Sequence, residues 1–171
     1  AVAVVAPAAA RAAHHAAPAP AAAALGCAAI PAGAHAAVRA ALQVLRDLFA
    51  KMGYTHVANH KRKAVELWQQ GDISYLLNAE PGSHASRFIA EHGPCAPSMG
   101  WRVVDAGHAF AHAVAKGATP FEGDGKVMDV PAIVGIGGSL IYFVDDYVDQ
   151  SPYNAEFDWI GPANPGGVGF A

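Results

Sequence analysis

Cysteine is scarce in this sequence, and long apolar runs and basic clusters are lacking. The 171 residues include only Cys27 and Cys95, too few for a disulfide framework, which favours a reducing compartment. No uncharged run of about 18 Leu-, Ile- or Phe-type residues occurs, so a membrane span is not expected. The net charge of −3 offers no basic stripe for nucleic acid. These absences predict a globular protein that binds neither membranes nor nucleic acid.

Acidic and aromatic residues are both missing from the first 40 positions, where 22 residues are Ala. Three interpretations of residues 1–41 are open: an Ala/Pro-rich tail, a targeting peptide, or out-of-frame translation of GC-rich DNA. A targeting peptide fits poorly because Arg is sparse and Ser is absent in this stretch. We therefore expect residues 1–41 to be a low-complexity segment that is disordered or not native sequence.

Ordinary globular sequence begins at Leu42. Apolar residues repeat at helical spacing from Leu42 to Met52, and Gly53 is placed to end this helix. Strands are predicted at 54–58, 64–69 and 73–78, because these stretches are rich in strand-forming residues and are separated by turn signals. Ser83 is a predicted N-cap for a short helix in "HASRFIAEH".

A second cycle of elements follows. "SMGWRVV" alternates as a half-buried strand does, and Asp105 is a predicted N-cap for a helix that ends at Gly117. A strand after the glycines near 137 and a last strand in "AEFDWI" complete the cycle. The two cycles predict a duplicated βαβββ unit, an α+β domain whose curved sheet forms a cleft. Only Ala-rich sequence precedes the first helix, so the first strand of unit one is expected to be missing or replaced, leaving a sheet edge unpaired.

The glycine-rich stretch "GIGGS" (135–139) invites a nucleotide-binding interpretation. A dinucleotide fingerprint needs a third glycine where Leu140 stands, and it must open a helix. The residues that follow, "LIYFVD", are instead typical of a buried strand. We expect these glycines to let the backbone bend into that strand.

Nine histidines raise the question of a metal site. His108 and His112 are spaced to hold Zn²⁺ on one helix face, but no third ligand is evident, which favours solvent-facing side chains. His56 and His60 lie near a strand and its turn, where exposed polar residues are expected.

Other reactive groups also lack partners in the sequence. Ser139 does not sit on a nucleophile elbow, and Cys95 has no basic neighbour. Asp145, Asp146 and Asp149 are expected in a solvated loop, with Ca²⁺ as a distant alternative. Trp68, Trp101 and Trp159 lie on separate predicted strands and are interpreted as core. We therefore predict no catalytic, cofactor-binding or metal-binding residue in this chain.

Several linked motifs carry a family resemblance. "LWQQGDI", "NAEP" and "HGP" occur in order before "PAIVGIGGSLIYFVD" (131–145), and "WRVVDAGHAFAHAVAKGAT" (101–119) lies between them. Together they resemble the N-terminal domain of 4-hydroxyphenylpyruvate dioxygenases, over about three quarters of the chain. The resemblance implies the vicinal oxygen chelate fold of paired βαβββ modules. It further implies a domain at 42–160, with modules of about 42–97 and 98–160, and the start of a linker at 161–171.

The same resemblance implies the activity of a parent protein. That family uses Fe²⁺ and O₂ to convert 4-hydroxyphenylpyruvate to homogentisate and CO₂ in cytoplasmic tyrosine breakdown. Its two-His, one-carboxylate iron site belongs to a second domain, whose first ligand follows a sequence like "NPGGVGF" (164–170). The expected partner of this chain is therefore its own catalytic domain, in a family that tends to form homo-oligomers.

Two rival interpretations stay open at this point. The chain could be a stand-alone vicinal oxygen chelate module that binds a small ligand or is purely structural. It could also come from a hydroxymandelate synthase-like enzyme, because the residues that separate the two products would lie in the second domain.

Overall fold

A computed structural model describes residues 2–6, 32–93, 95–145, 152–163 and 165–167. The elements in chain order are β1 (Val2–Ala6), α1 (Ala32–Lys51), β2 (Thr55–His60), β3 (Val65–Gln70), β4 (Ile73–Asn78), α2 (His84–His92), β5 (Ser98–Arg102), α3 (Ala106–Ala115), β6 (Ala132–Val134), the 3₁₀ turn η1 (Ile136–Gly138), β7 (Leu140–Val144), α4 (Pro152–Glu156) and β8 (Phe157–Trp159). Within these ranges no helix combines the length and the apolar character that crossing a bilayer requires.

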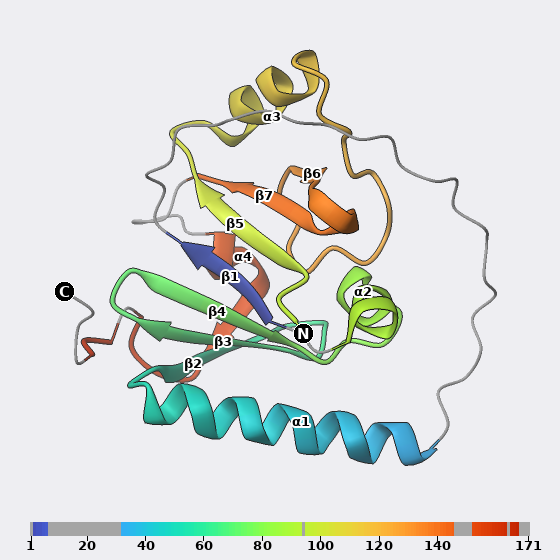
Figure 1. The fold of residues 1–171 in the computed structure, drawn as a ribbon. Helices are drawn as coiled ribbons and strands as arrows, with labels where there is room; N and C mark the ends of the chain where they lie inside the picture. The colour runs from blue at the N-terminus through green and yellow to red at the C-terminus, as the bar shows by residue number, and fades with distance from the viewer. Residues whose placement is uncertain (1, 7–31, 94, 146–151, 164, 168–171) are drawn as a thin grey trace.

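The eight strands form one curved sheet in the order β6-β7-β5-β1-β4-β3-β2-β8 (Figure 1). The first half follows the order β1-β4-β3-β2, with β4 beside β1, and the second contains β5-β7-β6, with β7 beside β5. The last strand, β8, pairs instead with β2 at the edge of the first half. Next to β6, Pro120 forms a bridge with Ile133, a remnant of one more strand. The two halves join where β1 and β5 pair in parallel. The α+β fold class expected from the sequence is confirmed.

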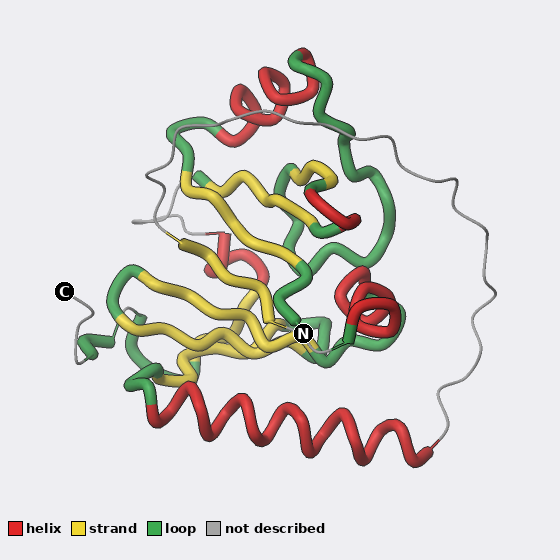
Figure 2. Tube along the Cα trace, viewed as in Figure 1, coloured by secondary structure: helices red, strands yellow, loops and turns green. Residues whose placement is uncertain are grey.

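Helices cover both faces of this sheet. On the α1 face, Leu42 and Phe49 of α1 pack on Trp68 and Leu77 of the sheet. On the opposite face, which we call the α4 face, Tyr153 of α4 packs with side chains of the central strands and of β8. The helices lie beside and behind the strands in Figure 2. Because alternate residues of a strand point to opposite faces, the period-2 pattern of each strand feeds both cores.

The caps predicted from the sequence are confirmed. The Ser83 side chain accepts a hydrogen bond from the Ser86 amide at the start of α2. The Asp105 side chain accepts one from the His108 amide at the start of α3, with a distance of 2.7 Å. The "AEFDWI" segment differs in part, because its first residues end the short helix α4 and only Phe157–Trp159 forms a strand.

Within the described ranges, the structure differs from the expectations of a missing first strand and of a helix that starts at Leu42. A strand does precede the first helix: Val2–Ala6 pairs with both β4 and β5, so no sheet edge is left open between the halves. The β-branched Val residues of "VAVVA" favour this extended form. Helix α1 also begins at Ala32 and not at Leu42. Ala has the highest helix propensity, which supports the longer helix. The rest of the predicted low-complexity segment, 7–31, lies outside the described residues.

Candidate functional site

The glycine-rich turn does not have the geometry of a nucleotide site. Its glycines form η1 and lead into strand β7, whereas a phosphate-binding loop opens a helix. Gly137 and Gly138 adopt φ of 65° and 83°, conformations that favour glycine. The Ser139 hydroxyl donates to the Ile136 carbonyl at 2.8 Å, which makes Ser139 part of the turn and not a nucleophile. The interpretation of these glycines as a bend into a strand is confirmed.

The α4 face of the sheet is filled by apolar side chains. Phe157 of β8 is 1% exposed, and Met128 and Tyr153 pack beside it against Leu67 and Leu76. Burial raises the pKa of Tyr153 to about 12, so this phenol is not a base near neutral pH. The cleft that the sequence predicted on this sheet is therefore occupied by the protein's own core.

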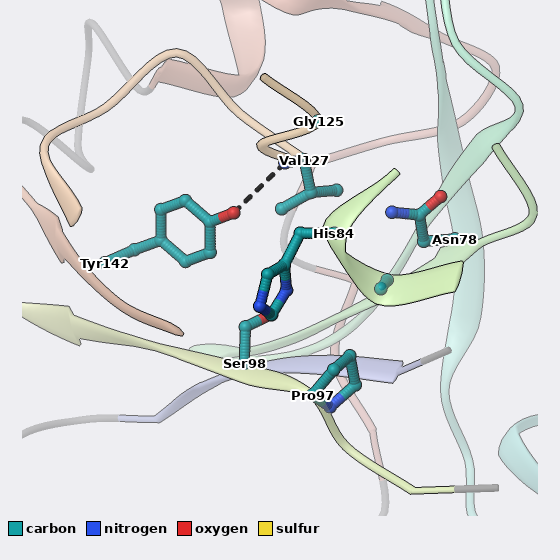
Figure 3. A pocket seen from close by; sticks show the side chains of 8 residues that line it. Asn78, His84, Pro97, Ser98, Gly125, Val127 and Tyr142 are labelled. Carbon is teal, nitrogen blue, oxygen red and sulfur yellow. Dashed lines mark hydrogen bonds between the residues drawn. The ribbon is translucent and has the colours of Figure 1, made fainter. Parts of the chain in front are cut away.

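A small cavity remains between α2 and the strands (Figure 3). It has a volume of about 10 Å³, room for about one water molecule. Asn78, His84, Ser98 and Tyr142 supply its polar lining. The Tyr142 hydroxyl accepts a hydrogen bond from the Val127 amide at 3.1 Å, and burial raises the Tyr142 pKa to about 12.

An open groove lies beside this cavity. It has a volume of about 190 Å³, and Lys63 and Lys126 line it. Both ammonium groups already donate to backbone carbonyl oxygens, at 3.0 Å and 3.2 Å. Sites for small molecules usually have about 300–1,000 Å³. Neither hollow therefore has the size of a substrate site.

His60 is fully buried, contrary to the expectation that it is an exposed turn residue. Its side chain has 0% exposure, and its Nε2 lies 3.1 Å from an oxygen of Glu156. Its Nδ1 accepts hydrogen bonds from the backbone amides of Arg62 and Lys63. Because Nδ1 accepts, Nε2 carries the proton and donates to Glu156. Both ring nitrogens are thus committed to protein partners, and neither is open to a metal ion.

The remaining histidines do not assemble a metal site. His56 stacks on Trp68, and its Nε2 lies 3.0 Å from the Asn59 side-chain oxygen. His108 and His112 are exposed neighbours on α3, with ring centroids 6.3 Å apart. Across the described part of the chain, no three His, Cys, Asp or Glu side chains gather as a metal would need. The described residues therefore do not fit an iron site.

The other residues singled out from the sequence have structural surroundings. Asp145 accepts a hydrogen bond from the Ala106 amide at 2.7 Å and so anchors α3. Asp146 and Asp149 lie outside the described residues, as does Cys27. Cys95 is a half-buried free thiol. Among the described residues, Asp145 and Cys95 do not belong to a cluster of metal-ligating side chains.

The three tryptophans have different environments. Trp68 is buried, at 7% exposure, and Trp159 is half-buried and packs against the core on the α4 face. Trp101 is 38% exposed, so its interpretation as core was wrong. Its strand alternates as predicted, but the Trp101 side chain stays partly exposed on the face opposite α4.

Comparison with known proteins places this fold in a family. Residues 20–158 match the family described as hydroxyphenylpyruvate dioxygenase, N-terminal. The hemolysin VllY of Vibrio vulnificus is 42% identical over 124 residues, which cover 71% of this chain and 35% of that protein. A 4-hydroxyphenylpyruvate dioxygenase of Pseudomonas aeruginosa is 41% identical over 132 residues, covering 75% of this chain and 37% of the enzyme.

A solved structure gives the same assignment. A xylose isomerase-like TIM barrel/4-hydroxyphenylpyruvate dioxygenase fusion protein superposes with a TM-score of 0.64 at 32% identity. The match covers 75% of this chain and 21% of that one. The chain thus spans about a third of the length of the curated relatives it matches. With its sheet order, its filled α4 face and these matches, the chain belongs to the family of hydroxyphenylpyruvate dioxygenase N-terminal domains.

Proposed function

We propose that this chain is the metal-free N-terminal domain of a longer 4-hydroxyphenylpyruvate dioxygenase-like enzyme and has no catalysis of its own. The filled α4 face carries this proposal. In a sheet of this kind a substrate would need an open concave surface, and here Phe157, Tyr153 and Met128 occupy it. The relatives named above extend about twofold beyond the matched region, which leaves room for a catalytic half.

The parent enzyme would convert 4-hydroxyphenylpyruvate and O₂ to homogentisate and CO₂. Iron would supply the oxygen chemistry from the other half, because the described residues here do not fit it. The role of this domain is to support that half and the assembly of the enzyme.

The test compares two proteins. The full-length gene product, loaded with Fe²⁺ and given 4-hydroxyphenylpyruvate, is expected to form homogentisate, whereas the 171-residue chain alone is expected to form none. Hydroxymandelate from the full-length protein would assign it to the rival activity. Turnover by the short chain would contradict the proposal.

A further inference from the structure

Two large apolar side chains are exposed in the middle of the sheet. Met99 and Trp101 on β5 are 45% and 38% exposed, and the Trp101 indole N–H lies 3.0 Å from the Met99 sulfur. We call this pair the Met99–Trp101 strip. It lies on the α1 face, because its register partners Ile141 and Phe143 alternate with Leu140 and Tyr142 of the core on the α4 face.

Other strands on the α1 face are covered. Trp68 and Leu77 there lie beneath α1 and are 7% and 1% exposed. β5 is an interior strand of the sheet, not an edge. Met99 and Trp101 are therefore an exposed apolar pair beside a covered part of the same face.

Trp101 lies near the C-terminal end of β5, at the strand ends where the outgoing segment contacts the sheet. The Gly71 amide, in the turn between β3 and β4, donates to the Pro165 carbonyl at 3.0 Å. The next residue in that turn, Asp72, accepts a hydrogen bond on its carbonyl from Arg102, which follows Trp101. Figure 1 shows the tip of β5 and the β3–β4 turn on the same side of the molecule. The Arg102 side chain lies on the α4 face, opposite Trp101, so this contact shows that the outgoing segment and the C-terminal end of β5 lie at the same end of the strands.

The size of the strip indicates a covalently tethered partner. A stable interface between separate chains buries about 800 Å² on each side, far more than two partly exposed side chains offer. A domain joined by a short linker has an effective concentration in the millimolar range, so a small contact suffices to hold it.

We propose that the Met99–Trp101 strip is the docking surface for the polypeptide that follows residue 171 in the longer protein. This inference rests on the proposed function, under which a catalytic half follows this domain. The partner surface presents apolar side chains to Trp101, which is the kind of residue that dominates binding energy at interfaces.

The test uses Trp101→Gln in the full-length protein and measures the rate at which a non-specific protease cuts the linker after residue 160. The cutting rate is expected to rise by about tenfold, since a buried tryptophan contact typically controls that much of a docking equilibrium. Trp101→Phe keeps an apolar ring and should restore most of the protection. Ile136→Gln is the matched control: Ile136 is 95% exposed on η1, and its replacement should leave the rate unchanged.

Two results would overturn the inference. One is a cutting rate for Trp101→Gln equal to that of the unaltered protein. The other is protection that disappears on dilution, which would identify a second copy of the protein as the occupant. Homogentisate formation is measured in parallel on the unaltered protein, so failure of the proposed function is seen separately from failure of docking.

Discussion

At the scale of single residues, His60 is a buried side chain whose two ring nitrogens both have protein partners. Its ring joins the turn after β2 to Glu156 at the end of α4, a link across 96 residues of sequence. Glu156 in turn accepts a hydrogen bond from the Asp129 amide at 2.8 Å. Three segments of the chain therefore meet at the His60–Glu156 pair.

Replacing His60 by Leu is expected to lower the free energy of unfolding by about 2–4 kcal/mol. The substitution removes the hydrogen bonds that the imidazole makes with one oxygen of Glu156 and with two backbone amides. Urea denaturation of the chain measures this loss. His108→Leu on the exposed face of α3 is the control and should change stability by no more than about 0.5 kcal/mol. Equal values for the two variants would contradict the buried link.

The same histidine makes stability depend on pH. Burial lowers the His60 pKa, and the opposing hydrogen bond to Glu156 does not outweigh this effect. As the pH falls below the unfolded value of about 6.5, the unfolded chain binds a proton more readily than the folded one. The contribution of His60 to stability is therefore full above pH 6.5 and is lost as the pH falls toward the lowered folded pKa.

His60→Leu is expected to reduce the slope of unfolding free energy against pH between about pH 6.5 and pH 5. Denaturation at several pH values measures it. His84, whose pKa is also lowered by burial, should supply part of the slope that remains. A variant with the full slope of the unaltered chain would show that His60 does not titrate on unfolding.

At the scale of elements, α1 is held to the sheet by an aromatic cluster and an ion pair. Phe49 is 4% exposed and stacks on Tyr75 with ring centroids 4.7 Å apart. Beside it, the Arg46 guanidinium donates to both oxygens of Glu66 at 3.0 Å and 3.1 Å. Burial would raise the Glu66 pKa, but hydrogen bonds from Arg46 and Trp68 outweigh it and lower the pKa.

Phe49→Ala is expected to destabilise the chain by about 3–5 kcal/mol, the range for removing a buried aromatic side chain. Val44→Ala on the same helix is the control, because Val44 is 66% exposed and should change stability by no more than about 0.5 kcal/mol. Thermal or urea unfolding measures both. Similar effects for the two would mean that α1 does not dock through Phe49.

Strand β1 joins the two halves of the sheet. Val4 is paired with Tyr75 on one side and Met99 on the other. Val4→Pro removes an amide donor from this interior strand, so amide exchange in β4 and β5 should become at least several-fold faster, while β2 and β3 keep their protection. Val4→Ala retains the amide and is the control. Unchanged exchange in β4 and β5 would remove β1 from this position.

At the scale of the whole molecule, sequence patterns predicted most of the fold. Caps such as Ser83 and Asp105 depend on a few neighbouring residues, and strand patterns depend on local alternation, so both can be recognised in one sequence. The glycine turn was interpreted correctly for the same reason, since Leu140 and the strand after it are local evidence.

Features that depend on distant contacts were missed. Nothing near His60 in the sequence reveals that Glu156 will contact it in the interior, and nothing near Trp101 reveals that its side chain will be 38% exposed. Strand β1 was missed because its five residues stand before a long Ala-rich stretch that dominates the composition, and its pairing with β4 and β5 is decided by the two halves of the sheet. Where tertiary contacts override local propensity, one sequence carries little signal.

Titration calorimetry of Co²⁺ into the 171-residue chain, with and without 4-hydroxyphenylpyruvate, measures whether the filled α4 face leaves any metal or substrate site open. Co²⁺ stands in for Fe²⁺ because it does not oxidise in air during the measurement. No stoichiometric binding is expected under either condition, because core side chains occupy the α4 face and both ring nitrogens of His60 have protein partners. Tight one-to-one binding that strengthens with the oxo acid would contradict this expectation.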